Sequence, residues 1–181
     1  MATPALLLTA HGSRDVRFGA TARAVAAAVA EALRGVRVEL AYLDLNAPLI
    51  GDALAGLSGP VTVVPLLFGD GFHSKIDLPA LLAEAHAADA SLAARQMPIV
   101  GRHSPVPALV DRLTEAGFVD DGRTGVLMYA VGSSDAGSDA SIRERGEHPL
   151  LQWHVWRDGD TRSFTPFRPS NMLTRDYLPF A

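Results

Sequence analysis

Three residues of this sequence can bind a metal ion or transfer a proton, and each follows a stretch typical of a buried strand. They are His11, Asp44 and His73. Two imidazoles and a carboxylate that converge can bind a divalent first-row metal ion and leave coordination positions open. The imidazoles can equally accept protons near neutral pH. The residue types alone leave both chemistries open.

Stretches with strand and helix patterns alternate up to about residue 117 and must position these three residues. The expected strands cover residues 6–10, 36–43, 61–68 and 92–100, and the expected helices cover 15–33, a short stretch closing near 56–59, 77–88 and 106–116. This alternation predicts an α/β fold with a parallel four-stranded sheet and flanking helices. Because the carboxyl ends of parallel strands meet at one edge, His11, Asp44 and His73 are expected to converge there.

Local signals refine these elements. Asn46 can cap the short second helix, with Pro48 in its first turn. Pro65 removes a ladder donor, which indicates a bulge or a distorted end in the third strand. The glycine-rich residues 69–75 are expected to form a flexible loop, and Gly117 is expected to end the fourth helix.

The sequence repeats itself after this first α/β unit. Residues 126–135 match residues 6–15 at a constant offset, with an apolar run, an alanine, Gly-Ser and an aspartate in common. We interpret the match as an internal duplication. Val131 stands where His11 stands in the first copy, so the second copy has lost the candidate site.

The second copy is expected to be incomplete, because too few residues follow Asp135 to repeat three strands and their helices. Residues 150–156 and 161–167 are instead predicted to form a β-hairpin around an Asp-Gly turn, followed by an irregular tail. An incomplete half leaves apolar sheet surface uncovered. This predicts either a homodimer or a hairpin folded over that surface.

The predicted domains follow from this organisation. Residues 1–120 form an α/β domain that carries the site, and residues 121–181 form the incomplete second half with its divergent tail.

Composition narrows the classes of protein and of site. The 181-residue chain is 48% apolar, enough for a full globular core, and its net charge of −4 argues against a general nucleic-acid binder. The absence of cysteine excludes disulfides, thiolate metal sites and cysteine nucleophiles. No apolar run reaches about 18 residues and no basic residue precedes the first one, which predicts a cytoplasmic protein without signal peptide or membrane span.

Three groups of motifs resemble those of a known family. They are LTAHGSR at 8–14, YLDL at 42–45 with Pro48, and VVPLL at 63–67 followed by GFH at 71–73 and DLP at 77–79. Together they resemble the class II chelatases, and more closely the sirohydrochlorin cobaltochelatases and ferrochelatases. The resemblance covers residues 4–117. The segment 132–135 is similar to the start of the second half in the family's long, duplicated members, and from about Ser138 the resemblance ends.

The resemblance implies a lyase that inserts a divalent metal ion into a sirohydrochlorin-type tetrapyrrole, on the route to cobalamin or sirohaem. It implies no ATP and no cofactor beyond the metal substrate, which would be Co²⁺, Fe²⁺ or Ni²⁺. It also implies a small-molecule substrate, with no nucleic-acid or membrane partner.

The resemblance also assigns residues. The family's two motif histidines match His11 and His73, as catalytic and metal-binding residues, and its acidic ligand, usually glutamate, falls on Asp44. Sirohydrochlorin is rich in carboxylates, so the site needs cationic groups and N–H donors around it. The expected substrate-binding residues are Gly12, Ser13, Arg14 and Lys75.

Two other functions stay open. A protein that keeps the pocket without turnover would be a non-catalytic metal or tetrapyrrole carrier. A serine hydrolase would use Ser134, in a turn that resembles a nucleophile elbow, with His148 or His154 as base and Asp139 as its orienting group. The His11–Gly12 turn would then supply the oxyanion donors. Metal insertion compared with hydrolysis of an activated ester discriminates between the classes.

Overall fold

A computed structural model of the chain describes residues 4–119, 126–131, 137, 140, 144 and 151–156. The chain divides into two compact units, Met1–Arg102 and His103–Ala181. The predicted limit between residues 120 and 121 lies in a segment outside the described residues and stays a prediction.

The first unit is an α/β layer structure, which confirms the predicted fold class. Its elements are β1 (Ala5–Ala10), α1 (Val16–Ala32), β2 (Arg37–Tyr42), α2 (Ile50–Ala55), β3 (Gly59–Pro65), a π-helical turn η1 (His73–Asp77), α3 (Leu78–Ala88), β4 (Leu92–Gln96) and a 3₁₀ turn η2 (Val100–Arg102). The four strands are all parallel in the order β2-β1-β3-β4. The central strand β1 is buried along its whole length, as a parallel strand covered on both faces must be.

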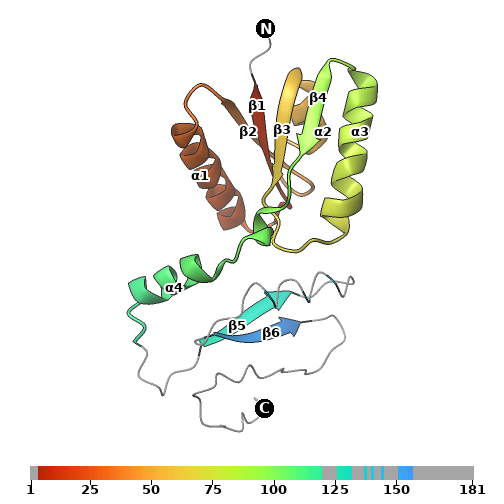
Figure 1. Cartoon of the computed structure of the whole chain (residues 1–181). Coiled ribbons are helices and arrows are strands. Elements are labelled where there is room, and N and C mark those ends of the chain that lie inside the picture. Colours follow the sequence, from red (N-terminus) through yellow and green to blue (C-terminus); the bar gives the residue numbers. More distant parts are fainter. Residues whose placement is uncertain are drawn as a thin grey trace. The chain divides into compact units, whose positions relative to one another are not determined.

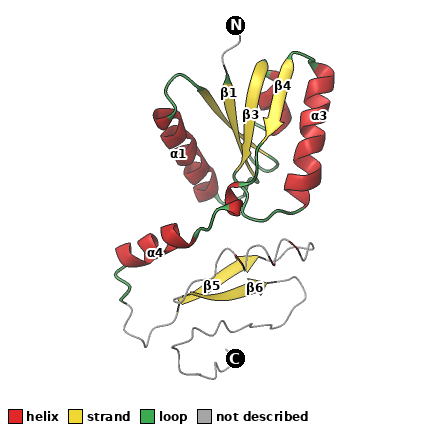
Figure 2. Cartoon of the chain, viewed as in Figure 1, coloured by secondary structure: helices red, strands yellow, loops and turns green. Residues whose placement is uncertain are grey.

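Helices cover the two faces of the sheet unequally. Figure 1 shows α1 beside one face and α2 and α3 beside the other. The larger core cluster lies with α2 and α3, where Leu7 and Val63 of the sheet pack with Leu54 and Leu78 of the helices. The smaller cluster lies under α1 and includes Ala22. The secondary-structure colouring in Figure 2 shows the same strand–helix alternation along the chain.

Two local predictions are wrong. Asn46 does not cap the second helix, because its side-chain oxygen accepts the backbone N–H of Ser13 at 2.7 Å. The helix α2 instead begins at Ile50, after Leu49, without any side-chain cap. The predicted loop 69–75 is also partly helical, since the π-helical turn η1 begins at His73.

Other local predictions are confirmed. Strand β3 ends at Pro65, where the ladder loses a donor, which confirms the expected irregularity there. The expected strand end at residue 68 is wrong. The helix α1 begins directly after Asp15.

The second unit begins with the helix α4 (Val106–Glu115). The next turn contains Gly117 at φ 78°, which fits the predicted glycine stop. Strands β5 (Val126–Val131) and β6 (Leu151–Trp156) pair in parallel. The pairing of β1 with β2 is also parallel, and the duplication itself stays a prediction.

The predicted hairpin is described only in its first arm. Residues 151–156 form β6, which pairs with β5. The Asp-Gly turn and the second arm, residues 161–167, are outside the described residues. Within the described segments, no helix combines the length and the apolar character that crossing a membrane requires.

The backbone of Gly12 lies very close to the backbone of Asp44. Its φ is +99°, and a Cβ built on it would lie 1.8 Å from the carbonyl oxygen of Asp44. Both the backbone conformation and the space therefore demand glycine at this position. Gly35 has a similar φ of +88°, but a Cβ there would meet nothing within 4 Å.

Replacing each of these glycines by alanine distinguishes the cost of the left-handed backbone conformation from the cost of the steric clash with Asp44. Gly35→Ala should lower the free energy of unfolding by about 1–2 kcal/mol, the cost of a left-handed backbone. Gly12→Ala should lower it by more than about 3 kcal/mol, because the chain after β2 must move as well. Urea unfolding measures both values. Equal losses in the two variants would show that the contact with Asp44 is unimportant.

Candidate functional site

The turn after β1 is held against its neighbours by backbone hydrogen bonds that continue beyond the strands. The N–H of Asp44 donates to the carbonyl of His11 at 3.0 Å, which prolongs the β1–β2 ladder. On the other side, the N–H of Leu66 donates to the carbonyl of Thr9 at 2.7 Å. The position of His11 is therefore fixed relative to both neighbouring strands.

His11 and His73 meet at the carboxyl edge of the sheet. Their Nε2 atoms are 3.2 Å apart although 62 residues separate them in the sequence. The ring centroids are 4.7 Å apart and the rings are nearly perpendicular, at 79°. Both residues are exposed, so a ligand can reach the pair from solvent.

The Nδ1 atoms of both rings are already engaged. Nδ1 of His11 lies 3.1 Å from the carbonyl oxygen of Gly12, and Nδ1 of His73 lies 2.6 Å from Oδ2 of Asp77. A carbonyl and an ionised carboxylate can only accept hydrogen bonds, so Nδ1 must donate in each ring. In the neutral rings this leaves two unprotonated Nε2 atoms close to each other.

Two facing acceptors of this kind need a cation between or beside them. Two nitrogen ligands bound at about 2.0–2.1 Å to a tetrahedral ion lie about 3.3–3.4 Å from each other. The observed separation of 3.2 Å is close to that edge length. The pair can hold one shared proton or supply two ligands to a divalent metal ion.

The Asp44 carboxylate is not part of this pair. Its Oδ1 accepts the N–H of Leu45 at 2.7 Å, although its backbone lies directly against the His11–Gly12 turn. Among the described residues there is no group of three or more His, Asp or Glu side chains that could hold a metal ion. The structure thus brings His11 and His73 together and leaves the Asp44 side chain turned to its own backbone.

The predicted substrate-binding residues differ in what they can offer. Gly12 is buried in the turn, and the N–H of Ser13 is already donated to Asn46. The Oγ of Ser13 accepts the N–H of Asp15 at 3.1 Å. Arg14 and Lys75 are exposed and follow His11 and His73 closely in the chain.

The turn η1 that carries His73 is anchored by Ser74, which is only 4% exposed. Its Oγ lies 2.9 Å from both Oδ1 of Asp70 and the carbonyl of Gly71, and Gln96 of β4 donates to its carbonyl at 2.8 Å. Sequence reasoning missed Ser74 and Asp77. The four-residue spacing of His73 and Asp77 was the available signal.

Several large apolar side chains are exposed in the segments that follow β2 and β3. Phe72, directly before η1, is 63% exposed, and Ile76, within η1, is 53% exposed. Leu45, directly after Asp44, is 48% exposed, and Phe68 is 64% exposed. Exposed large apolar side chains next to a polar pair are typical of a surface that receives an apolar ligand.

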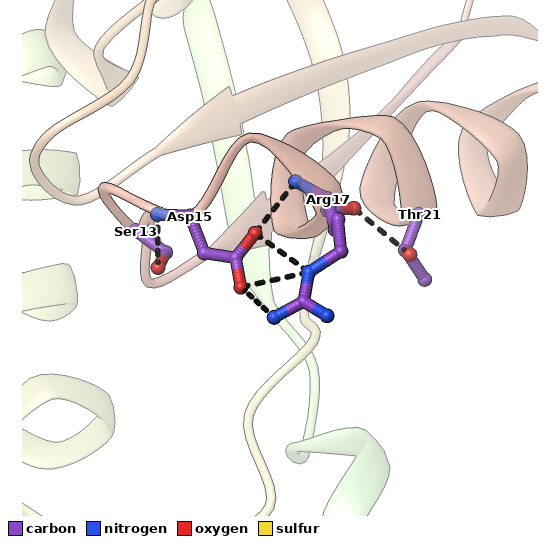
Figure 3. Close-up of polar contacts among 4 residues, drawn as sticks. All are labelled: Ser13, Asp15, Arg17 and Thr21. Carbon is purple, nitrogen blue, oxygen red and sulfur yellow. Dashed lines mark hydrogen bonds and ion pairs between the residues drawn. The ribbon is translucent and has the colours of Figure 1, made fainter.

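The N-terminus of α1 is already neutralised. Asp15 caps the helix by accepting the N–H of Arg17 at 2.9 Å, and its carboxylate also pairs with the Arg17 guanidinium (Figure 3). The Arg17 side chain is the main cause that lowers the pKa of the Asp15 carboxyl, and the Arg17 N–H adds to it. This helix end therefore offers little to an anionic substrate.

Comparison with known proteins gives a family match that covers the first unit from β1 onward and continues over helix α4. The family model described as CbiX matches residues 5–116. The sirohydrochlorin cobaltochelatase of Saccharolobus islandicus (strain L.S.2.15 / Lassen #1) is 43% identical over 49 residues. That of Saccharolobus solfataricus is 41% identical over 49 residues. Each match covers 25% of this chain and 38% of the relative's length.

Solved structures share the fold at lower identity. The sirohydrochlorin chelatase SirB from Bacillus subtilis subspecies spizizenii, in complex with cobalt, has a TM-score of 0.69 and 21% identity. That match covers 85% of this chain and 67% of SirB. A CbiX protein from Marinobacter aquaeolei VT8 has a TM-score of 0.52 and 23% identity, and the match covers 63% of this chain and 96% of that one.

The Asp15–Arg17 pair makes the stability of the first unit depend on pH. A lowered pKa in the folded state means that the carboxylate stabilises the fold above its ordinary value of 3.8. This stabilisation is lost as the pH falls through the lowered pKa. The chain should therefore melt at a higher temperature than Asp15→Asn at about pH 5–7, and the gap should close as the pH falls below about 4.

Arg17→Gln is the matched control, since it removes the other partner. The difference in melting temperature between Arg17→Gln and the unchanged chain should follow the same pH dependence. The double variant should melt at the same temperature as either single variant. Thermal melts followed by circular dichroism measure the gap. A gap that is independent of pH would contradict a role for the carboxylate charge.

Proposed function

The chain belongs to the CbiX family of class II chelatases, and we propose that it inserts Co²⁺ or Fe²⁺ into a sirohydrochlorin-type tetrapyrrole without ATP. The observation that carries the proposal is the pair of Nε2 atoms 3.2 Å apart at an exposed sheet edge. The metal ion is a substrate of this reaction rather than a resident cofactor. Ni²⁺ suits the same nitrogen and oxygen donors.

The chemistry is an exchange of one metal ion for two protons. A free tetrapyrrole carries two pyrrole N–H groups, and both protons leave as the divalent ion enters. When the metal ion leaves the Nε2 atoms of His11 and His73, their lone pairs become free to accept protons. The exposure of both rings lets those protons pass on to water.

The metal is held by few ligands, which suits transfer. A closed site of four protein ligands is typical of structural metal, whereas catalytic sites keep positions open. Two imidazoles leave room for macrocycle nitrogens to replace water on the ion. Because the chain has no cysteine, no thiolate is present to bind the metal ion very tightly.

The surroundings suit a flat, carboxylate-rich macrocycle. Exposed apolar groups at Phe72, Ile76 and Leu45 can contact the face of a tetrapyrrole. Arg14 and Lys75 can pair with peripheral carboxylates. We assign the substrate carboxylates to these two cationic side chains, because the Ser13 N–H is donated to Asn46 and carries no charge.

We assign Asp44 as a third metal ligand that joins when the ion is present. The backbone N–H of Asp44 donates to the carbonyl of His11, so the residue lies beside the turn that carries His11. A divalent ion competes with the Leu45 N–H for that carboxylate, because charge–charge attraction exceeds a single hydrogen bond at an exposed site.

Mixing the purified chain with sirohydrochlorin and Co²⁺ or Fe²⁺, and following the absorbance, tests the function. His11→Ala and His73→Ala should each slow insertion by at least about 100-fold, since each removes a ligand and a proton acceptor. His86→Ala is the control, because His86 contacts Leu92 at the opposite edge of the sheet. Unchanged insertion in the His11→Ala, His73→Ala double variant would overturn the assignment.

The same assay separates the alternatives. A carrier would bind metal or tetrapyrrole without the absorbance change of insertion. A hydrolase would cleave an activated ester through Ser134, a residue outside the described part of the chain.

Asp44→Ala should weaken metal capture without abolishing insertion. We expect the Kd for Co²⁺ to rise about tenfold, which corresponds to about 1.4 kcal/mol. Asp44→Glu should retain most of the affinity, because it keeps the carboxylate and matches the family's usual residue. Isothermal titration with Co²⁺ measures both. An Asp44→Ala variant with unchanged affinity would remove Asp44 from the ligand set.

A further inference from the structure

We infer that Asp77 is a positioning residue that holds His73 in the tautomer with the proton on Nδ1, and thereby keeps its Nε2 free for metal. That a free Nε2 serves to bind metal rests on the proposed function. That Asp77 fixes the tautomer rests only on the geometry of η1.

The contact between the two side chains is short and local. Oδ2 of Asp77 lies 2.6 Å from Nδ1 of His73, four residues earlier in the same π-helical turn. The side chain of Asp77 is 35% exposed and that of His73 is 49% exposed. A short contact between a carboxylate and an imidazole fixes the orientation of the ring as well as its tautomer.

The turn that carries both residues is rigidly attached to the core. Ser74, directly after His73, is buried and hydrogen-bonded through its side chain and its carbonyl. Leu78, directly after Asp77, is fully buried in the larger core cluster. The spacing between Asp77 and His73 is therefore set by anchored backbone on both sides. π-helical turns of this kind occur frequently at functional sites.

The two histidines are oriented by different acceptors. His11 donates to the neutral carbonyl of Gly12 at 3.1 Å, within its own turn. His73 donates to a carboxylate at 2.6 Å. A hydrogen bond to an ionised acceptor is stronger than one to a neutral acceptor. His73 is therefore the more firmly held of the two rings, and Asp77 is the residue responsible.

The isosteric variant Asp77→Asn tests this. Its amide NH₂ can donate to Nδ1, which places the ring proton on Nε2, where it would be donated to Nε2 of His11 across the 3.2 Å gap. The metal then has to displace that proton. We expect the affinity for Co²⁺ to fall about 10–100-fold, the usual cost of losing a residue that orients a metal ligand. Asp77→Glu should restore part of the affinity, because it keeps a carboxylate.

The tautomer is read directly from ¹⁵N spectra of the full chain labelled at histidine nitrogen, in which protonated and unprotonated ring nitrogens are well separated. His73 should show a protonated Nδ1 in the unchanged chain and a protonated Nε2 in Asp77→Asn. His73→Ala assigns the signal. Asp52→Asn, an exposed aspartate of α2, is the matched control and should change neither the spectrum nor the Co²⁺ affinity.

The outcomes separate this inference from the proposed function. An unchanged His73 tautomer in Asp77→Asn overturns the inference, even if the variant melts earlier, because that pattern indicates a purely structural ion pair. A changed tautomer with unchanged Co²⁺ affinity overturns it as well. A changed tautomer in a chain that binds Co²⁺ but never inserts it leaves the role of Asp77 standing and rejects the chelatase function.

Discussion

The site depends on how closely two backbone segments approach each other at the end of β1. The carbonyl of Asp44 occupies the space that a side chain at Gly12 would need. The same approach allows the N–H of Asp44 to reach the carbonyl of His11. Because β1 lies between β2 and β3 in the sheet, its turn is constrained from both sides. A histidine in that turn is consequently held by the sheet rather than by its own contacts.

His73 reaches the same point by a different route. It does not belong to the sheet, and the loop after β3 has to carry it back over the strand ends. Ser74 fixes this return, since it is buried and accepts a hydrogen bond from Gln96 of β4. The histidine pair thus joins a turn on the central strand to a helical turn tied to the edge strand. Each histidine is attached to the core through its own segment, so neither one depends on the other for its position.

Much of this arrangement was predictable from the sequence, because it follows from rules about strands. The alternation of strand and helix patterns predicts parallel strands, and parallel strands bring His11 and the start of the loop before His73 to one edge. The family match over residues 5–116 confirms what the motifs indicated.

Side-chain choices were not predictable in the same way, because polar side chains in turns satisfy the nearest unpaired backbone group. Asn46 has the propensity of a helix cap, yet it accepts the Ser13 N–H. Asp44 accepts the N–H of Leu45 rather than facing the histidines. The sequence predicts a helix start at Asp77, because the glycine-rich stretch before it indicates a loop. The π-helical turn that brings the Asp77 carboxylate to Nδ1 of His73 has no signal of its own there beyond the four-residue spacing.

The two histidines and the acceptors beside them give the site its electrostatic character. The Nδ1 atoms of both imidazoles lie against acceptors, a carbonyl and a carboxylate, so in the neutral rings the two Nε2 atoms face each other with lone pairs. That arrangement favours any cation that enters, yet two ligands alone cannot enclose it. A structural metal site would bury the ligands and complete the set, whereas both rings are exposed and the exposed Phe72 directly precedes His73. Under the proposed function, such an open pair would present a metal ion and leave the remaining coordination positions to the nitrogens of an incoming macrocycle.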